Sequence, residues 1–173
     1  EAKEHPPAYY FNLKKALKAA ADKDTPYTPA HTLIAAQVQS LRLILKEGIE
    51  NVWKRTSMLS KAMLAAVDAL GLKPLAERPS TALTTILVPQ GIDGPAWEKL
   101  LEKTYGVKVA GGQGSLKGKI IRVAHMGYID AIDVVGIVAA LEWSLAQLGH
   151  PVEIGKGVLA ATKSLAADMQ VKK

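Results

Sequence analysis

The stretch Lys119-Ile120-Ile121-Arg122-Val123-Ala124 decides the fold class, because it sets one charged residue inside a run of β-branched ones. Such residues fit the pleated surface of a sheet, so the run predicts a strand over 119–124. A second β-branched run predicts a strand over 81–88, and a third predicts a short strand over 107–109. The glycine-rich segment 110–118 then forms a hairpin-like turn between the last two strands.

Helical patterns lie on both sides of these strands. Apolar residues at helical spacing predict helices over 12–22, 93–105 and 130–148, and a further helix after Pro151. Short strands joined by a glycine turn and flanked by helices indicate an α+β fold. The sheet is expected to be short, mostly antiparallel and covered by helices, and not doubly wound.

A long helical segment precedes the predicted sheet. Thr28-Pro29 is typical of a helix start, with the threonine as N-cap and the proline in the first turn. The apolar pattern then runs to Gly71, a C-terminal cap, with an interruption at Gly48. The segment 29–71 is therefore expected to be two consecutive helices or one long kinked helix.

The composition restricts the function classes. The 173 residues carry 22 Lys and Arg against 16 Asp and Glu, a net charge of +6, but the basic residues are scattered. With one Phe and three Trp, this favours a solvated cationic surface over nucleic-acid binding. The chain has no cysteine, and its four histidines form no H-x-x-x-H pair, so no metal site can be read. No apolar stretch approaches the length of a membrane span.

The first residues contain no signal peptide, and the chain begins at Glu1 without a methionine. We therefore expect a cytoplasmic protein whose sequence is entered in the middle of a longer polypeptide.

Arg122 is the first candidate for binding chemistry. Because side chains alternate along a strand, it shares a face with Ile120 and Ala124. A guanidinium among apolar neighbours either points to solvent or meets an anion, and spacing alone favours solvent. Arginine suits a carboxylate, to which it donates two parallel hydrogen bonds.

Three other features admit a functional and a structural interpretation. The helix start at Thr25 and Thr28 presents N–H groups that attract phosphate, although most N-cap threonines are only caps. The run 111–114, Gly-Gly-Gln-Gly, matches no nucleotide-binding spacing and is better read as a β-turn. One interpretation of His125 is a proton shuttle, but a surface or hydrogen-bonding role is favoured. Spacing brings together no catalytic triad and no carboxylate pair.

Four segments together resemble the class V aminotransferases, and they follow that family's order over nearly the whole chain. The nearest members are the alanine–glyoxylate, serine–glyoxylate and serine–pyruvate enzymes. The segments are Tyr9-Tyr10-Phe11-Asn12-Leu13-Lys14-Lys15, Thr25-Pro26-Tyr27-Thr28-Pro29-Ala30, Glu47-Gly48-Ile49-Glu50-Asn51-Val52-Trp53, and Ala110-Gly111-Gly112-Gln113-Gly114 leading to Lys117 through Tyr128.

The resemblance implies a fold type I, homodimeric transaminase that uses pyridoxal 5'-phosphate and has its site at the dimer interface. Its substrates would be a small amino acid and a 2-oxo acid such as glyoxylate or pyruvate. Arg122 matches the arginine that holds the substrate's α-carboxylate. Thr28 matches a threonine that reaches the cofactor phosphate, and Thr25 occupies the position of a second phosphate contact, which is often a tyrosine.

In that family the Schiff-base lysine and the aspartate that pairs with the pyridine nitrogen would both precede Glu1. No catalytic residue is therefore expected in this chain, and alone it should not transaminate. The resemblance divides the chain into an entry segment of the large domain (1–28), an interdomain helix or helix pair (29–71) and a small α+β domain (72–173). The alternatives are a non-catalytic dimerisation or interaction module and, on charge alone, a weak nucleic-acid binder.

Overall fold

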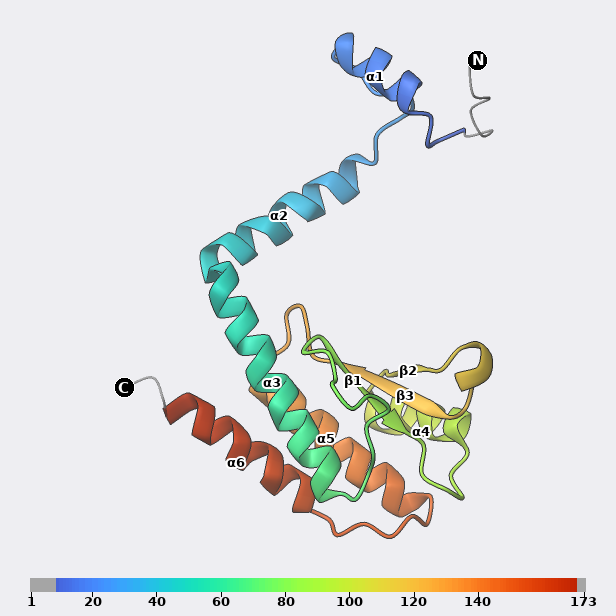
Figure 1. The fold of residues 1–173 in the computed structure, drawn as a ribbon, viewed down its shortest axis with the longest axis vertical. Coiled ribbons are helices and arrows are strands. Elements are labelled where there is room, and N and C mark those ends of the chain that lie inside the picture. Colours follow the sequence, from blue (N-terminus) through green and yellow to red (C-terminus); the bar gives the residue numbers. More distant parts are fainter. Residues whose placement is uncertain (1–8, 171–173) are drawn as a thin grey trace. The chain divides into compact units, whose positions relative to one another are not determined.

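The computed structural model describes residues 9–170, and these form two compact units (Figure 1). The boundary in the sequence lies between Glu47 and Gly48. The first unit contains helices α1 (Leu13–Ala21) and α2 (His31–Glu47). The second contains four helices and one sheet. None of the helices within residues 9–170 is long and apolar enough to cross a membrane.

The first unit is organised locally. Asn12 caps α1, because its Oδ1 accepts a hydrogen bond from the Lys15 N–H at 3.1 Å. The rings of Tyr9, Tyr10 and Tyr27 cluster with centroids 4.8–5.1 Å apart. Neither α1 nor α2 contains a buried residue, although both carry large apolar side chains.

The second unit begins with the long helix α3 (Ile49–Ala69). Gly48 separates it from α2 with a positive φ of 87°, so the predicted pair of helices is confirmed. Gly71 ends α3 as predicted. It has a φ of 69° and donates to the Asp68 carbonyl, while Leu72 donates to the Val67 carbonyl. This pair of bonds is a Schellman motif, which satisfies the last carbonyls of the helix.

The sheet has three antiparallel strands in the order β1-β3-β2, which confirms the predicted α+β class. They are β1 (Leu83–Leu87), β2 (Ala110–Gly111) and β3 (Ile120–Ala124). The predicted third strand was misplaced, because β2 follows the segment 107–109 and does not include it. Gly106 ends helix α4 in a left-handed conformation, and the chain enters β2 only after residues 107–109.

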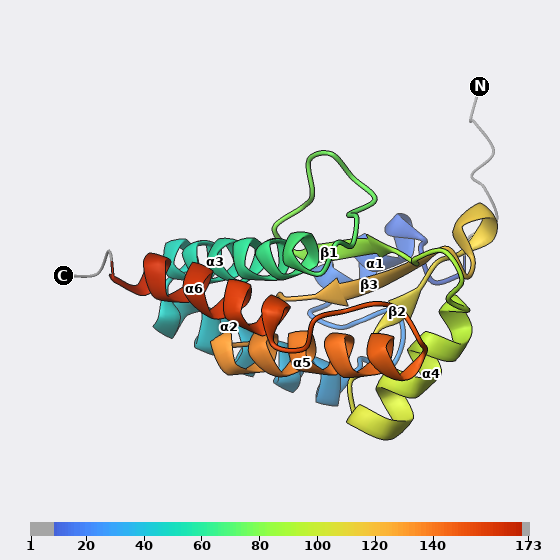
Figure 2. The same cartoon turned by 90° about the horizontal axis from the view of Figure 1, so that it is seen from below.

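Helices cover one face of the sheet (Figures 1 and 2). These are α4 (Gly94–Tyr105), capped by Asp93, and α5 (Ala131–Gln147), which starts with an Asp130 capping box. The last helix, α6 (Lys156–Gln170), packs against α3 and α5. The core between the helices and the sheet is built from aliphatic side chains and one tryptophan, including Leu59, Met63, Val67, Ile86, Trp97, Leu101, Ile121, Val134, Val138, Leu141 and Leu145.

A buried carboxylate joins α5 to the start of α6. Glu142 is 1% exposed, and its two oxygens accept hydrogen bonds from the N–H groups of Gly155 (2.7 Å), Gly157 (2.7 Å) and Val158 (3.0 Å). These are N–H groups that a helix start leaves without partners inside the helix. Gly157 is needed there, because a Cβ at this position would lie 3.0 Å from Glu142 Oε1 and 2.9 Å from Leu70 Cγ.

Candidate functional site

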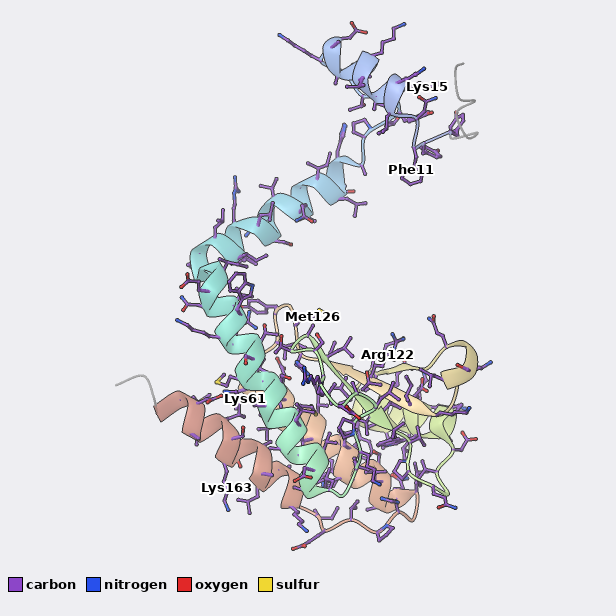
Figure 3. The ribbon with its side chains drawn as sticks, in the orientation of Figure 1. Phe11, Lys15, Lys61, Arg122, Met126 and Lys163 are labelled. Atoms are coloured by element: carbon purple, nitrogen blue, oxygen red, sulfur yellow. The ribbon has the colours of Figure 1, made fainter. Side chains whose placement is uncertain are left out.

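The open face of the sheet carries Arg122. Along β3, Ile121 and Val123 point into the core, so Arg122 between them lies on the opposite face. In the antiparallel register Arg122 is opposite Thr85 on one side and Ala110 on the other. Figure 3 shows Arg122 beside the sheet, on the side away from α5. The alternation predicted from the sequence is therefore confirmed.

The Arg122 guanidinium is held in one orientation. Its Nε donates to the Gly111 carbonyl at 3.1 Å, and the side chain is half-buried. Within residues 9–170, no group accepts from its terminal nitrogens and no carboxylate pairs with it. A fixed cation with two free parallel donors matches the geometry of a carboxylate.

The glycine-rich stretch between β2 and β3 is a turn, as interpreted from the sequence. It contains a short 3-10 helix, Gly114–Leu116, and two glycines with positive φ, Gly114 at 54° and Gly118 at 73°. No α-helix follows it, so it does not have the geometry of a nucleotide-binding loop. The Gly111 carbonyl that accepts from Arg122 Nε lies just before this turn, in β2.

His125 directly follows β3 and is completely buried, so the expected surface position is wrong and the hydrogen-bonding role is confirmed. Its Nε2 lies 2.9 Å from Thr84 Oγ1. Its Nδ1 makes no well-formed hydrogen bond within residues 9–170, although the Thr81 backbone is near. Burial lowers the pKa of His125 below 6.5, and the Thr81 backbone only partly opposes this effect. The ring is therefore a neutral structural element at neutral pH.

This burial predicts how stability depends on pH. In the unfolded chain His125 has its ordinary pKa near 6.5, so at lower pH the unfolded state binds the proton first. The free energy of unfolding should fall as the pH drops through 6.5 toward the lowered folded pKa. Urea unfolding of the wild type and of His125→Gln at several pH values measures the difference. An identical pH dependence in the two proteins would contradict this account.

The loop after His125 is tied to α3 by a residue that the sequence analysis did not single out. Arg55 donates from Nη1 to the carbonyls of Gly127 (3.1 Å) and Ile129 (2.8 Å). These contacts span more than 70 positions in sequence, so periodicity could not reveal them. Arg55 is one of three charged residues in the first half of α3, so nothing in the sequence set it apart.

The candidate phosphate contacts Thr25 and Thr28 belong to the first unit, and both are exposed. The predicted N-cap role of Thr28 is wrong, because α2 starts at His31 and its first helical bond runs from the Ile34 N–H to the Ala30 carbonyl. Thr25 Oγ1 donates to the Tyr27 carbonyl at 2.7 Å. The Thr28 hydroxyl has no partner in the described part of the chain.

No group of three or more metal-ligating side chains occurs among residues 9–170. The candidate residues thus fall in different units: Arg122 in the second, and Thr25 and Thr28 in the first.

Comparisons with known proteins show which proteins the chain resembles. No family model matches the chain. The chain is 37% identical to the soluble hydrogenase small subunit of a Synechococcus strain over 92% of its own length and 42% of the relative. It is also 37% identical to the L-aspartate–glyoxylate aminotransferase of Paracoccus denitrificans over 90% of its length and 40% of that enzyme.

A solved structure agrees with these relatives. Pyridoxamine–pyruvate aminotransferase from Mesorhizobium loti superposes with a TM-score of 0.81 at 35% identity, covering 85% of this chain and 38% of that one. The matched region is the C-terminal portion of those proteins. The chain thus spans about two fifths of the length of the curated relatives that it matches.

Proposed function

Because this chain is homologous to the C-terminal portion of the class V aminotransferases, we propose that it supplies the substrate-carboxylate site of a pyridoxal-phosphate-dependent transaminase. The proposed reaction moves an amino group between a small amino acid and a 2-oxo acid such as glyoxylate or pyruvate. The observation that carries the proposal is the orientation of Arg122, half-buried on the open sheet face with both terminal nitrogens free.

Arg122 would bind the α-carboxylate that amino acids and 2-oxo acids share. Two parallel N–H donors fix both the position and the plane of the carboxylate, so the rest of the substrate is aimed in one direction. Both half-reactions need this contact, since both substrates carry the same group at the same place. The same residue would therefore serve the donor and the acceptor.

The threonines of the first unit fit a phosphate only in part. The exposed Thr28 hydroxyl is available as a donor, whereas the Thr25 hydroxyl would first have to release the Tyr27 carbonyl. We therefore assign Thr28 as the main phosphate contact of this chain and Thr25 as a secondary one. When bound, pyridoxal phosphate supplies the carbon that accepts the amine and a ring that withdraws electrons from it.

The remaining assignments are part of the same proposal. Residues 1–28 would be an entry segment from the large domain, 29–71 the interdomain helices and 72–173 the small domain. The exposed apolar residues of α1 and α2, such as Leu13 at 78% and Leu17 at 72%, support packing against further protein. A homodimer in the cytoplasm is the proposed state of the complete enzyme.

A direct prediction concerns the chain by itself. Transamination needs a lysine that holds the cofactor, and no lysine of this chain lies in the family's lysine motif. The isolated chain should therefore show no turnover with pyridoxal phosphate, an amino acid and a 2-oxo acid, whereas the full-length gene product should. Coupled assays of the released 2-oxo acid measure both. Turnover by the isolated chain, or none by the full-length protein, would contradict the proposal.

A further inference from the structure

The hydrogen bond from Arg122 Nε to the Gly111 carbonyl determines how a carboxylate can bind. Nε has a single N–H, and at 3.1 Å that donor is already used. A carboxylate is then restricted to the two terminal nitrogens and must approach end-on, not along the Nε side. The position of the Gly111 carbonyl therefore sets the direction of the free donors.

Strand β2, which carries this carbonyl, is only two residues long, so its ladder alone holds it weakly. The next residue, Gly112, packs directly on the backbone of the following turn. A Cβ on Gly112 would lie 2.0 Å from the Leu116 carbonyl oxygen and 2.5 Å from its carbon. That oxygen cannot move away freely, because it accepts the Lys119 N–H at 3.0 Å just before β3.

We propose that Gly112 is a positioning residue for Arg122. Its missing side chain lets the 110–118 turn fold back on β2, and this contact fixes the Gly111 carbonyl below the guanidinium. Gly112 thereby selects for substrates with a planar carboxylate presented end-on. The inference rests on the proposed carboxylate role of Arg122 and extends it to the turn.

A glycine of another element provides a matched control. Gly136 is exposed in α5, and a Cβ there would meet nothing within 4 Å. Neither Gly112 nor Gly136 has a positive φ, so alanine is allowed by the backbone at both. The two substitutions differ in whether the new methyl group meets fixed backbone or open space.

The experiment uses the full-length protein and its Gly112→Ala and Gly136→Ala variants. We expect Gly112→Ala to raise the KM for the amino acid at least about 10-fold, with kcat at saturation nearly unchanged, because a displaced guanidinium weakens carboxylate binding in ground and transition states alike. Gly136→Ala should stay close to the wild type. With an amine substrate that lacks the carboxylate, Gly112→Ala and the wild type should have the same KM.

The possible failures are distinguishable. Equal KM values for Gly112→Ala and Gly136→Ala, or an equal defect with the amine substrate, would overturn the positioning role. If Arg122→Ala also left the amino-acid KM unchanged, the proposed function itself would fail. If Gly112→Ala does not fold, the test is the hydrogen-exchange rate of the Arg122 Nε–H in the wild-type protein, measured by NMR. Slow exchange is expected for a donor bonded to Gly111, and exchange as fast as in a free arginine would overturn the inference.

Discussion

Arg122→Ala in the full-length protein is expected to lower kcat/KM for the amino acid by about 10²-fold, because losing one partner of a charge-assisted, two-bond pair removes roughly 3 kcal/mol. The 2-oxo acid should suffer a similar loss, since both substrates present the same carboxylate. Steady-state kinetics with each substrate varied in turn measure this. Unchanged kinetics would remove Arg122 from the site.

Arg122→Lys separates charge from geometry. Lysine keeps the positive charge but cannot bond the Gly111 carbonyl and offer two parallel donors at the same time. We expect this variant to resemble Arg122→Ala more than the wild type. Full activity in Arg122→Lys would mean that charge alone is enough and that the fixed guanidinium has no special role.

Glu142→Ala is expected to cause the largest loss of stability, about 4 kcal/mol in the free energy of unfolding. It removes the acceptor of three N–H groups at the start of α6 and leaves a cavity between α5 and α6. Glu142→Gln keeps the shape of the side chain but replaces one acceptor oxygen with an NH2 group that faces N–H donors. About 2 kcal/mol of the free energy of unfolding should therefore be lost.

The control for this experiment is Glu153→Gln, which lies just before α6. Its side chain is 78% exposed and meets only Lys156 at 3.9 Å, so little change is expected. Urea unfolding of the three variants measures the differences. A Glu142→Ala protein as stable as the Glu153→Gln protein would show that the buried carboxylate does not stabilise the junction of α5 and α6.

Local signals in the sequence predicted most of the elements. The caps Asn12, Asp93 and Asp130 act within one helical turn, and Gly71 closes α3 through its own backbone conformation. Such signals involve neighbouring residues only, so they can be read directly. The alternation along 119–124 likewise separates Arg122 from the buried Ile121 and Val123.

Features that depend on distant residues could not be read in this way. The short strand was predicted at 107–109 because Val107 and Val109 are β-branched. In the structure Gly106 is left-handed and Val107 donates to the Leu101 carbonyl, so this segment lies outside the sheet. Val107 and Val109 pack against the core instead. Propensity identified apolar residues and could not say which surface they would contact.

The site shows the same division. Sequence spacing left open whether Arg122 faced solvent or an anion, because its orienting partner Gly111 lies 11 positions away. Glu142 was not singled out, although an acid in the middle of the apolar helix over 131–147 was a usable signal of a buried acceptor. Thr28 was assigned to a cap by its Thr-Pro pair, but α2 starts three residues later.

The most direct test is a crystal structure of the full-length protein with a bound amino acid or a 2-oxo acid. The account predicts that the substrate carboxylate spans the two terminal nitrogens of Arg122 at about 2.7–2.9 Å, while Nε stays bonded to the Gly111 carbonyl. A substrate carboxylate bound elsewhere, with Arg122 facing bulk water, would contradict it.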